Sequence, residues 1–237
     1  VMHFEGDRDG ALRLLRVIKH RFGATDRVGM FRMTKRGIES LDDPSGLLLA
    51  DRQAGVPGSA VVAVLEGHRP VLVEVQALVS PRPAGSGGFG TRTVTGLVPR
   101  RIDLILAVLA QRAQLDLSSA DVFVSVAGGL TVREPAADLA IAAAVVSSAT
   151  LRAVPGDVMM LGEVGLTGEL RSVPEPSRRI SEAARLGFSR IVAPRDRSVR
   201  PAGGEVEWAR SARLQQVATL GEAMHAMSLQ DAGLRAV

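Results

Sequence analysis

Alternating and continuous apolar runs dominate the chain after residue 57. Residues 58–67 and 69–80 are two β-rich runs separated by a short Gly-His turn, and together they predict a β-hairpin. Longer apolar segments predict helices over 101–113 and 135–150. Shorter runs predict strands at 121–127, 158–161 and 190–193, and helices at 176–186 and 220–227. Strands and helices mixed in this way predict an α/β (α+β) fold.

The first forty residues follow a different pattern. Residues 1–4 and 28–33 predict strands, whereas residues 10–18 predict an amphipathic helix with Leu12 and Leu15 on its apolar side. A unit this small cannot bury its own faces, so we expect it to be the last part of a larger domain.

Residues 37–58 are rich in Asp, Pro, Ser and Gly and predict a linker. One short helix is predicted within 42–50, with Asp43 as its N-cap and Pro44 at its first position.

The amino-acid composition limits the kind of core, the metal sites and the membrane segments that this chain can have. Hydrophobic residues make up 46% of the 237 residues and aromatic residues only 3%, so the core is built from Val, Leu, Ile and Ala. The absence of Cys excludes disulfides and Cys-ligated zinc within the chain, and the four scattered His predict no metal site. No apolar run approaches the ~18–20 residues that span a bilayer, and no signal peptide is visible. We therefore expect a cytoplasmic protein without a membrane partner.

The basic residues are unusual in kind. The net charge is +4, and only Lys19 and Lys35 are lysines, so the other basic residues are arginines. This bias has two interpretations. It reflects a GC-rich genome, or it reflects contact with phosphate, because the planar guanidinium group binds two oxygens at once.

Two stretches, 128–148 and 162–188, resemble the proteolytic domain of the Lon family in order, spacing and helix placement. In that family a Ser at the start of the first helix is the nucleophile and a Lys on the later helix is its base. Ala136 and Ser177 occupy those two positions here, and no Lys follows Lys35. The resemblance therefore implies a Lon-protease-like domain that is proteolytically inactive.

A second resemblance covers essentially the whole chain. The motif KHRFG at 19–23, EPAAD at 134–138 and the run at 179–188 resemble the RadA (Sms) family. His20 replaces an Asn of the family motif, and the loop 83–88 is longer than usual. The resemblance implies that residues 1–42 are the C-terminal segment of a RecA-type ATPase domain and that residues 43–237 are the Lon-like domain.

The RadA resemblance also implies a function. The full-length protein is then an ATP-dependent DNA motor, a DNA-dependent ATPase or helicase that processes recombination intermediates by branch migration in homologous recombination and DNA repair. Expected partners are single-stranded and branched DNA, a recombinase, and further copies in a hexameric ring. No phosphate-binding GxxxxGK[ST] motif occurs in this sequence, so we expect no cofactor here. ATP and Mg²⁺ belong to the full-length protein, and zinc to its N-terminal module.

Two groups of basic residues are candidates for function. Lys19 and Arg21 are expected to reach ATP on the adjacent subunit of a ring, because a cation at the γ-phosphate stabilises charge in the transition state. Arginines in loops and at helix starts are expected to contact DNA phosphates, and a cation at a helix N-terminus opposes the helix dipole, which favours an external partner. The DNA candidates are Arg92 and Arg101, supported by Arg82, Arg100 and Arg133.

An alternative hypothesis is an ATP-dependent Lon-type serine peptidase with relocated catalytic residues. Ser147, Ser148 or Ser177 would then be the nucleophile. A base would have to come from Asp138 or Glu163 by an unfamiliar route.

Overall fold

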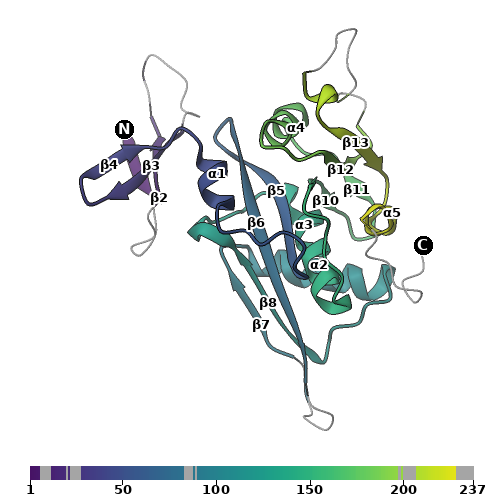
Figure 1. Cartoon of the computed structure of the whole chain (residues 1–237). Coiled ribbons are helices and arrows are strands. Elements are labelled where there is room, and N and C mark those ends of the chain that lie inside the picture. Colours follow the sequence, from purple (N-terminus) through teal and green to yellow (C-terminus); the bar gives the residue numbers. More distant parts are fainter. Residues whose placement is uncertain are drawn as a thin grey trace.

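A computed structural model gives the arrangement of the chain. It contains a four-stranded sheet near the N-terminus, a seven-stranded sheet and a two-stranded one. Figure 1 shows the N-terminal sheet to one side of the larger body, which holds the seven-stranded sheet and its helices. The structure describes residues 1–5, 12–19, 21, 28–82, 88, 90–196, 199 and 207–227.

The N-terminal sheet is antiparallel throughout and has the order β1-β2-β3-β4. Leu12, Leu14 and Met30 are its buried hydrophobic residues, and they join the core of the larger body. Its strands are β1 (Met2–Glu5), β2 (Leu12–Val17), β3 (Val28–Thr34) and β4 (Gly37–Ser40).

The helix predicted over 10–18 was wrong, because most of that segment forms the strand β2. Its short apolar run fits both periodicities, and strands on both sides decide the outcome: Leu14 pairs with Glu5 on β1 and with Met30 on β3. Leu12 and Leu14 therefore point to one face, instead of Leu12 and Leu15.

The seven-stranded sheet has the order β13-β12-β9-β5-β6-β8-β7. Strand β6 runs antiparallel to both of its neighbours, and the other pairs are parallel. The predicted hairpin is confirmed as β5 and β6, and the predicted α/β class is confirmed. The strands are β5 (Ser59–Glu66), β6 (Arg69–Pro81), β7 (Arg92–Thr95), β8 (Ala120–Val126), β9 (Val158–Met160), β12 (Arg190–Pro194) and β13 (Arg213–Val217).

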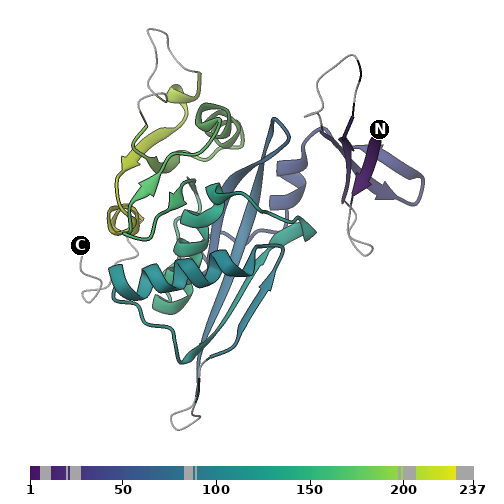
Figure 2. The same cartoon turned by 180° about the vertical axis from the view of Figure 1, so that it is seen from behind.

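Helix α3 lies at the centre of the body. It packs against β5 and β6, and α2 packs against α3 as the outer helix (Figure 2). Helices α1 and α4 also contact β6. The predicted cap is confirmed, because the Asp43 side chain accepts a hydrogen bond from the Gly46 N–H at 3.1 Å. The helices are α1 (Pro44–Leu49), α2 (Pro99–Arg112), α3 (Asp138–Thr150), α4 (Pro176–Arg185) and α5 (Leu220–Ala226).

Short elements complete the body. The segment before α3 forms a 3₁₀ turn, η2 (Pro135–Ala137), where the pattern predicted the first turn of the helix. The small sheet pairs β10 (Glu163–Val164) with β11 (Leu170–Arg171). Two further 3₁₀ turns are η1 (Ala127–Gly129) and η4 (Glu207–Arg210).

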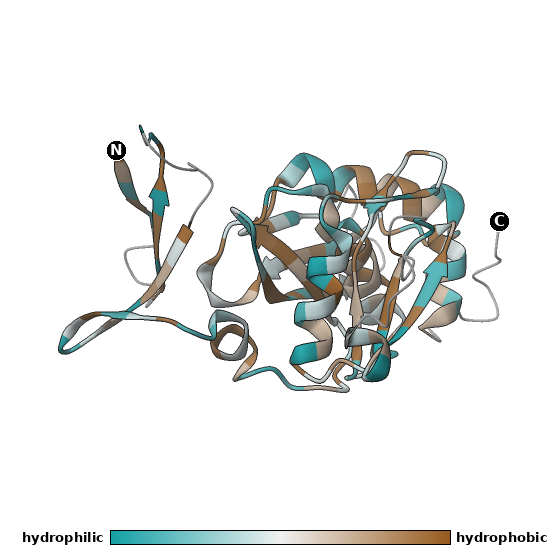
Figure 3. Cartoon of the chain, turned by 90° about the horizontal axis from the view of Figure 1, so that it is seen from above, coloured by the Kyte–Doolittle hydropathy of each residue, from teal (hydrophilic) through white to brown (hydrophobic). Residues whose placement is uncertain are grey.

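Coverage of the seven-stranded sheet changes along β6. Residues 71–75 are all buried, so both faces of the strand are covered there. From Gln76 on, Gln76, Leu78 and Ser80 are exposed while the residues between them remain buried or half-buried. The hydrophobic interior shows in Figure 3 as the brown strands within the body. Half of β6 therefore presents one open face to solvent.

Two searches of the described residues were negative. None of their helices is long and apolar enough to cross a membrane. No group of three or more His, Cys, Asp or Glu side chains in the same part of the chain could hold a metal ion.

Candidate functional site

The two positions of the Ser–Lys resemblance lie in different surroundings. Ala136 is 1% exposed in η2, and its carbonyl accepts a hydrogen bond from the Gly162 N–H at 3.1 Å. Ser177 is exposed at the start of α4 and lines a cavity of about 540 Å³ together with Trp208. Ala136 does not line that cavity. The structure thus does not bring Ala136 and Ser177 into one pocket.

The side chain of α4 that reaches the segment of Ala136 is Arg179. Its guanidinium group is fully buried and donates two hydrogen bonds to Glu134, at 2.8 and 2.6 Å. Because a guanidinium group does not deprotonate in a protein, Arg179 cannot act as a general base. The sequence analysis missed this pair. Its signal is the helical spacing that puts Arg179 one turn before Ala183, on the buried face of α4.

The Arg179–Glu134 pair closes an open sheet edge. Strand β5 pairs with β9 only at Val61, which leaves the following backbone groups on that edge without a strand partner. Arg179 donates to the Ala63 carbonyl at 2.6 Å, and Glu134 accepts from the Leu65 N–H at 2.7 Å. Buried backbone groups need such partners, so this pair supports the fold.

A second ion pair holds the start of α2. Arg101 donates two hydrogen bonds to the carboxylate of Asp138, which also accepts from the Val164 N–H at 3.1 Å. Burial raises the pKa of Asp138, and the hydrogen bonds to Asp138 raise the pKa of Arg101. Arg101 therefore has an internal counter-charge. The sequence analysis expected an external partner because a cation at a helix start opposes the helix dipole. Asp138 supplies the opposing charge inside the chain, so the dipole gives no reason to expect an external one.

Two of the serines named in the alternative hypothesis form hydrogen bonds with backbone groups. Ser147 accepts from the Gly58 N–H at 2.9 Å and donates to the Arg152 carbonyl. Ser148 accepts from the Val79 N–H at 2.9 Å. Both hydroxyl groups therefore tie α3 to the beginning of β5 and the end of β6.

The five arginines predicted to bind DNA fall into two groups. An isolated bridge between Leu97 and Val132 places the start of α2 beside the loop that carries Arg133. Arg92 lies at the other end of β7, where it donates to the carbonyls of Ala120 and Leu117 at 2.7 and 3.0 Å. The first group is Arg100, Arg101 and Arg133. The second is Arg92 with Arg82, because Arg82 follows Pro81, which pairs with Ala120 at the end of β6.

The arginines also differ in their freedom. Arg100 and Arg133 are exposed, and neither forms an ion pair with another described residue. Arg92 and Arg101 are half-buried, and their guanidinium groups donate hydrogen bonds to other residues of the chain. Arg100 and Arg133 are therefore the better placed of these four to bind a phosphate.

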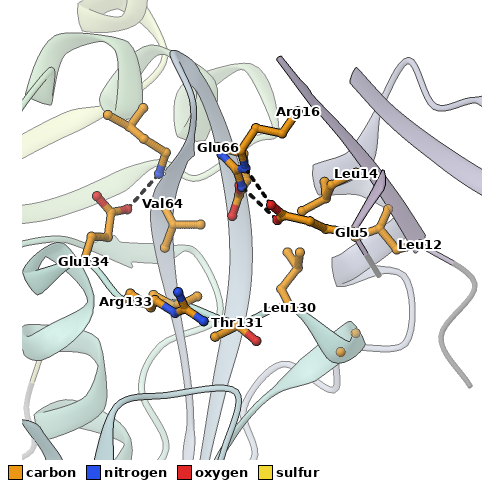
Figure 4. Close-up of a pocket in the computed structure, with 14 residues that line it drawn as sticks. Glu5, Leu12, Leu14, Arg16, Val64, Glu66, Leu130, Thr131, Arg133 and Glu134 are labelled. Carbon is orange, nitrogen blue, oxygen red and sulfur yellow. Dashed lines mark hydrogen bonds and ion pairs between the residues drawn. The ribbon is translucent and has the colours of Figure 1, made fainter. Parts of the chain in front are cut away.

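A cavity of about 630 Å³ lies between the N-terminal sheet and the body. Figure 4 shows Arg16 beside Glu5 and Glu66, at 3.2 and 2.9 Å, with Arg133 on the opposite side of the cavity. Burial raises the pKa of Glu66. The Arg16–Glu66 ion pair joins β2 to β5 across this junction.

Lys19 and Arg21 lie just beyond β2 and are exposed. The amino group of Val1 donates to the Lys19 carbonyl at 2.6 Å, which fixes the backbone at this point. His20 and residues 22–25 of the motif lie outside the described residues.

Comparison with known proteins identifies relatives over most of the chain. Proteins named DNA repair protein RadA are 47% identical over 206 residues in Mycolicibacterium smegmatis, 45% over 194 residues in Halalkalibacterium halodurans and 42% over 224 residues in Listeria monocytogenes. These matches cover 87%, 82% and 94% of the chain. Residues 100–197 also match the family model described as subunit ChlI of Mg-chelatase.

The chain spans 42–47% of the length of these three relatives. What the longer proteins do beyond their shared region is therefore not carried by the match itself. Within that limit, the level of identity and its extent along the chain agree with the family that the motifs at 19–23, 134–138 and 179–188 indicated. The chain belongs to the RadA family of DNA repair proteins.

Proposed function

We propose that the chain is the C-terminal part of an ATP-dependent DNA motor that processes recombination intermediates by branch migration in homologous recombination and DNA repair. The observation that carries this proposal is the identity of 42–47% to three proteins named DNA repair protein RadA. In this proposal the longer protein holds ATP and Mg²⁺ and, in an N-terminal module, zinc. Its partners are single-stranded and branched DNA, a recombinase and further copies in a hexameric ring.

The larger body is proposed to be a Lon-protease-like scaffold, residues 43–237, without protease chemistry. Support comes from Ala136, which carries no nucleophile, and from Arg179, which brings a permanent cation where a base is needed. Turnover of a casein-type substrate together with fluorophosphonate labelling of any Ser would contradict this part of the proposal.

The N-terminal sheet, within residues 1–42, is proposed to end a RecA-type ATPase domain. The face of this sheet that points away from the body carries apolar side chains. The ring centroids of Phe4 and Phe31 lie 6.3 Å apart, and Met33 on β3 lies opposite Ile38 on β4. Phe4 is 53% exposed and Ile38 51% exposed, so no described residue covers this face fully, and a larger domain would supply the cover. Lys19 and Arg21 would then act on ATP of the adjacent subunit.

The body is also proposed to contact DNA through its phosphates. Arg100 and Arg133 are exposed beside each other's segments, and a cation pair of this kind binds a backbone without reading its sequence. Arg101 would support the site by fixing the start of α2, and Arg92 and Arg82 would extend the contact past the other end of β7.

Binding of single-stranded and branched DNA measured against salt concentration tests this contact. Arg100→Ala and Arg133→Ala are each expected to lower the slope of the log–log salt dependence by ~0.7–1. Arg213→Ala is the matched control, because this exposed arginine lies on β13 at the opposite edge of the sheet. Slopes and affinities identical to those of the unmodified chain would refute the contact.

A further inference from the structure

Helix α4 packs against η4, the 3₁₀ turn that precedes β13 (Figure 1). Both elements line the cavity of about 540 Å³ that contains Ser177, a volume within the range of small-molecule sites. Ser177 and Ser181 line it from α4, Trp208 lines it from η4, and Ser211 follows that turn. None of the arginines proposed to contact DNA lines this cavity.

The indole of Trp208 leaves a buried donor without an acceptor. Trp208 is 7% exposed, and within the described part of the chain its Nε1–H group has no hydrogen-bond partner. A buried indole N–H usually has an acceptor, because burial without one costs free energy. Since Trp208 lines the cavity, an acceptor atom of a ligand held there would satisfy this donor.

The beginning of α4 adds donors at the same cavity. Glu175 is the N-cap, but its side chain forms no capping hydrogen bond, and the first turn contains no acidic residue. Pro176 has no N–H, so the uncapped donors of this described helix are the backbone N–H groups of Ser177 and Arg178. Because Ser177 lines the cavity, the positive end of a ten-residue helix borders it, and such an end favours an anion.

Two arginines line the cavity, and they differ in how firmly they are held. Arg185 forms ion pairs with Asp43 and Glu182, at 3.0 and 2.9 Å. Among the described residues Arg178 has one ion pair, with Glu175 at 3.3 Å, and these side chains are 55% and 46% exposed. An exposed pair of this kind contributes little free energy, so a bound anion would readily replace Glu175. Arg178 is therefore the cation available to a ligand.

The number of donors favours a phosphoryl group over a carboxylate. The donors are the first backbone N–H groups of α4, the Ser177 hydroxyl, the Arg178 guanidinium group and the indole N–H of Trp208. A carboxylate has two acceptor oxygens, whereas a phosphate monoester has three that are strong acceptors. The carboxylate that lines the cavity, Glu182, is already paired with Arg185 and accepts from the Ser45 hydroxyl at 2.9 Å, so its charge is compensated.

We propose that this cavity, bordered by Ser177, Arg178 and Trp208, binds the phosphoryl group of a small molecule, as free phosphate or as a phosphate monoester. The site goes beyond the proposed DNA motor and does not depend on it. Ser177, which the resemblance to Lon aligned with a base, would then hold an anion instead of taking a proton.

Trp208 provides its own probe, because the chain has one Trp and no Tyr. Titration with inorganic phosphate at constant ionic strength should change the Trp208 emission until it saturates, since a new hydrogen bond forms at its shielded Nε1. Arg178→Met should raise the Kd about tenfold, the effect of one lost charge-assisted hydrogen bond. Arg32→Met is the matched control, because Arg32 forms a similar exposed ion pair with Glu39 away from the cavity. Circular dichroism should show that both variants are folded.

Trp208→Phe provides an independent arm, because Phe keeps an aromatic ring and removes the N–H donor. Calorimetric titration of this variant with phosphate should give a Kd about threefold to tenfold higher than that of the unmodified chain. Adenosine monophosphate identifies the source of the phosphoryl group: tighter binding than phosphate indicates a monoester, and equal or weaker binding indicates free phosphate.

Three results would overturn the proposal. They are an emission that phosphate leaves unchanged, equal affinities of Arg178→Met and Arg32→Met, and an unchanged affinity of Trp208→Phe. Displacement of phosphate by single-stranded DNA, with a loss of DNA affinity in Arg178→Met, would also overturn it in favour of a further DNA contact. Arg100→Ala should leave the phosphate titration unchanged, so the proposed DNA contact and this site are tested separately.

Discussion

The two main sheets of this protein differ in what they can bury. In the body, β5 keeps Val61, Val62 and Ala63 at 0% exposure, because neighbouring strands and helices cover both faces. In the N-terminal sheet, β1 leaves Met2 63% and Phe4 53% exposed. Among the described residues the body therefore buries its central strand, whereas the N-terminal sheet leaves one apolar face exposed. In the proposed function this difference separates a scaffold from an element that works against a neighbouring domain.

The strongest test of this division changes the N-terminal sheet without touching the body. In a protein that contains the whole ATPase portion, Lys19→Ala or Arg21→Ala is expected to lower DNA-stimulated ATP hydrolysis by ~10³–10⁵, the effect of losing a cation that acts in trans. The unfolding temperature of the body should stay the same. Lys35→Ala is the control, since Lys35 is exposed in the same sheet. Unchanged hydrolysis in both variants would refute the assignment.

The next largest effect is expected inside the body. Arg179→Met should lower the free energy of unfolding by about 3–5 kcal/mol, because Glu134 would remain at the sheet edge without its cation. Urea denaturation measures the loss, and Arg179→Met/Glu134→Gln should restore part of it. The neighbouring Arg178 is 55% exposed, so Arg178→Met should change stability by no more than about 0.5 kcal/mol. Equal effects of the two arginine variants would contradict the role given to Arg179.

These two regions also differ in how well the sequence predicted them. The hairpin of β5 and β6 and the helices of the body followed from periodicity, because their apolar runs are long. Strand β2 was mistaken for a helix, because six residues fit both patterns and pairing with β1 and β3 decided between them. Strands β4, β7 and β13 were not predicted, because none of them contains a continuous apolar run and most of their side chains are not buried.

The site residues show why local sequence is not enough. Ala136 and Ser177 were chosen by their positions in two motifs. The side chain that meets the Ala136 segment is instead Arg179, which lies on the buried face of α4, whereas Ser177 is exposed. Arg101 was expected to seek an external phosphate, and Asp138 is its partner inside the chain. Both pairs join residues 37 or 45 positions apart, and no local periodicity encodes such contacts.

A smaller effect is expected at the junction between the two regions. The Arg16 and Glu66 side chains are 34% and 11% exposed, so the pair is only partly shielded and Arg16→Met should cost about 1 kcal/mol or less. Hydrogen exchange should accelerate in β1 to β4 and remain unchanged in β5 and β6. Arg32→Met is the control, because Arg32 pairs with Glu39 within the same sheet. Faster exchange throughout the body would mean that the two regions unfold together.

The smallest expected effect concerns a surface turn of the body, between β10 and β11. Hydrogen bonds from Thr167 and the backbone, helped by Arg171, lower the pKa of Glu169 from 4.5 to about 2. Since the folded-state pKa lies below the unfolded one, the stabilisation is present above about pH 4.5 and is lost as the pH falls towards 2. NMR titration of the Glu169 carboxyl should give the lowered pKa, and Thr167→Val should raise it towards the usual value. Glu169→Gln should flatten the stability profile in this window alone. A Glu169 that titrates near pH 4.5 in the unmodified chain would show that the hydrogen bonds from Thr167 and Arg171 do not hold this turn in solution.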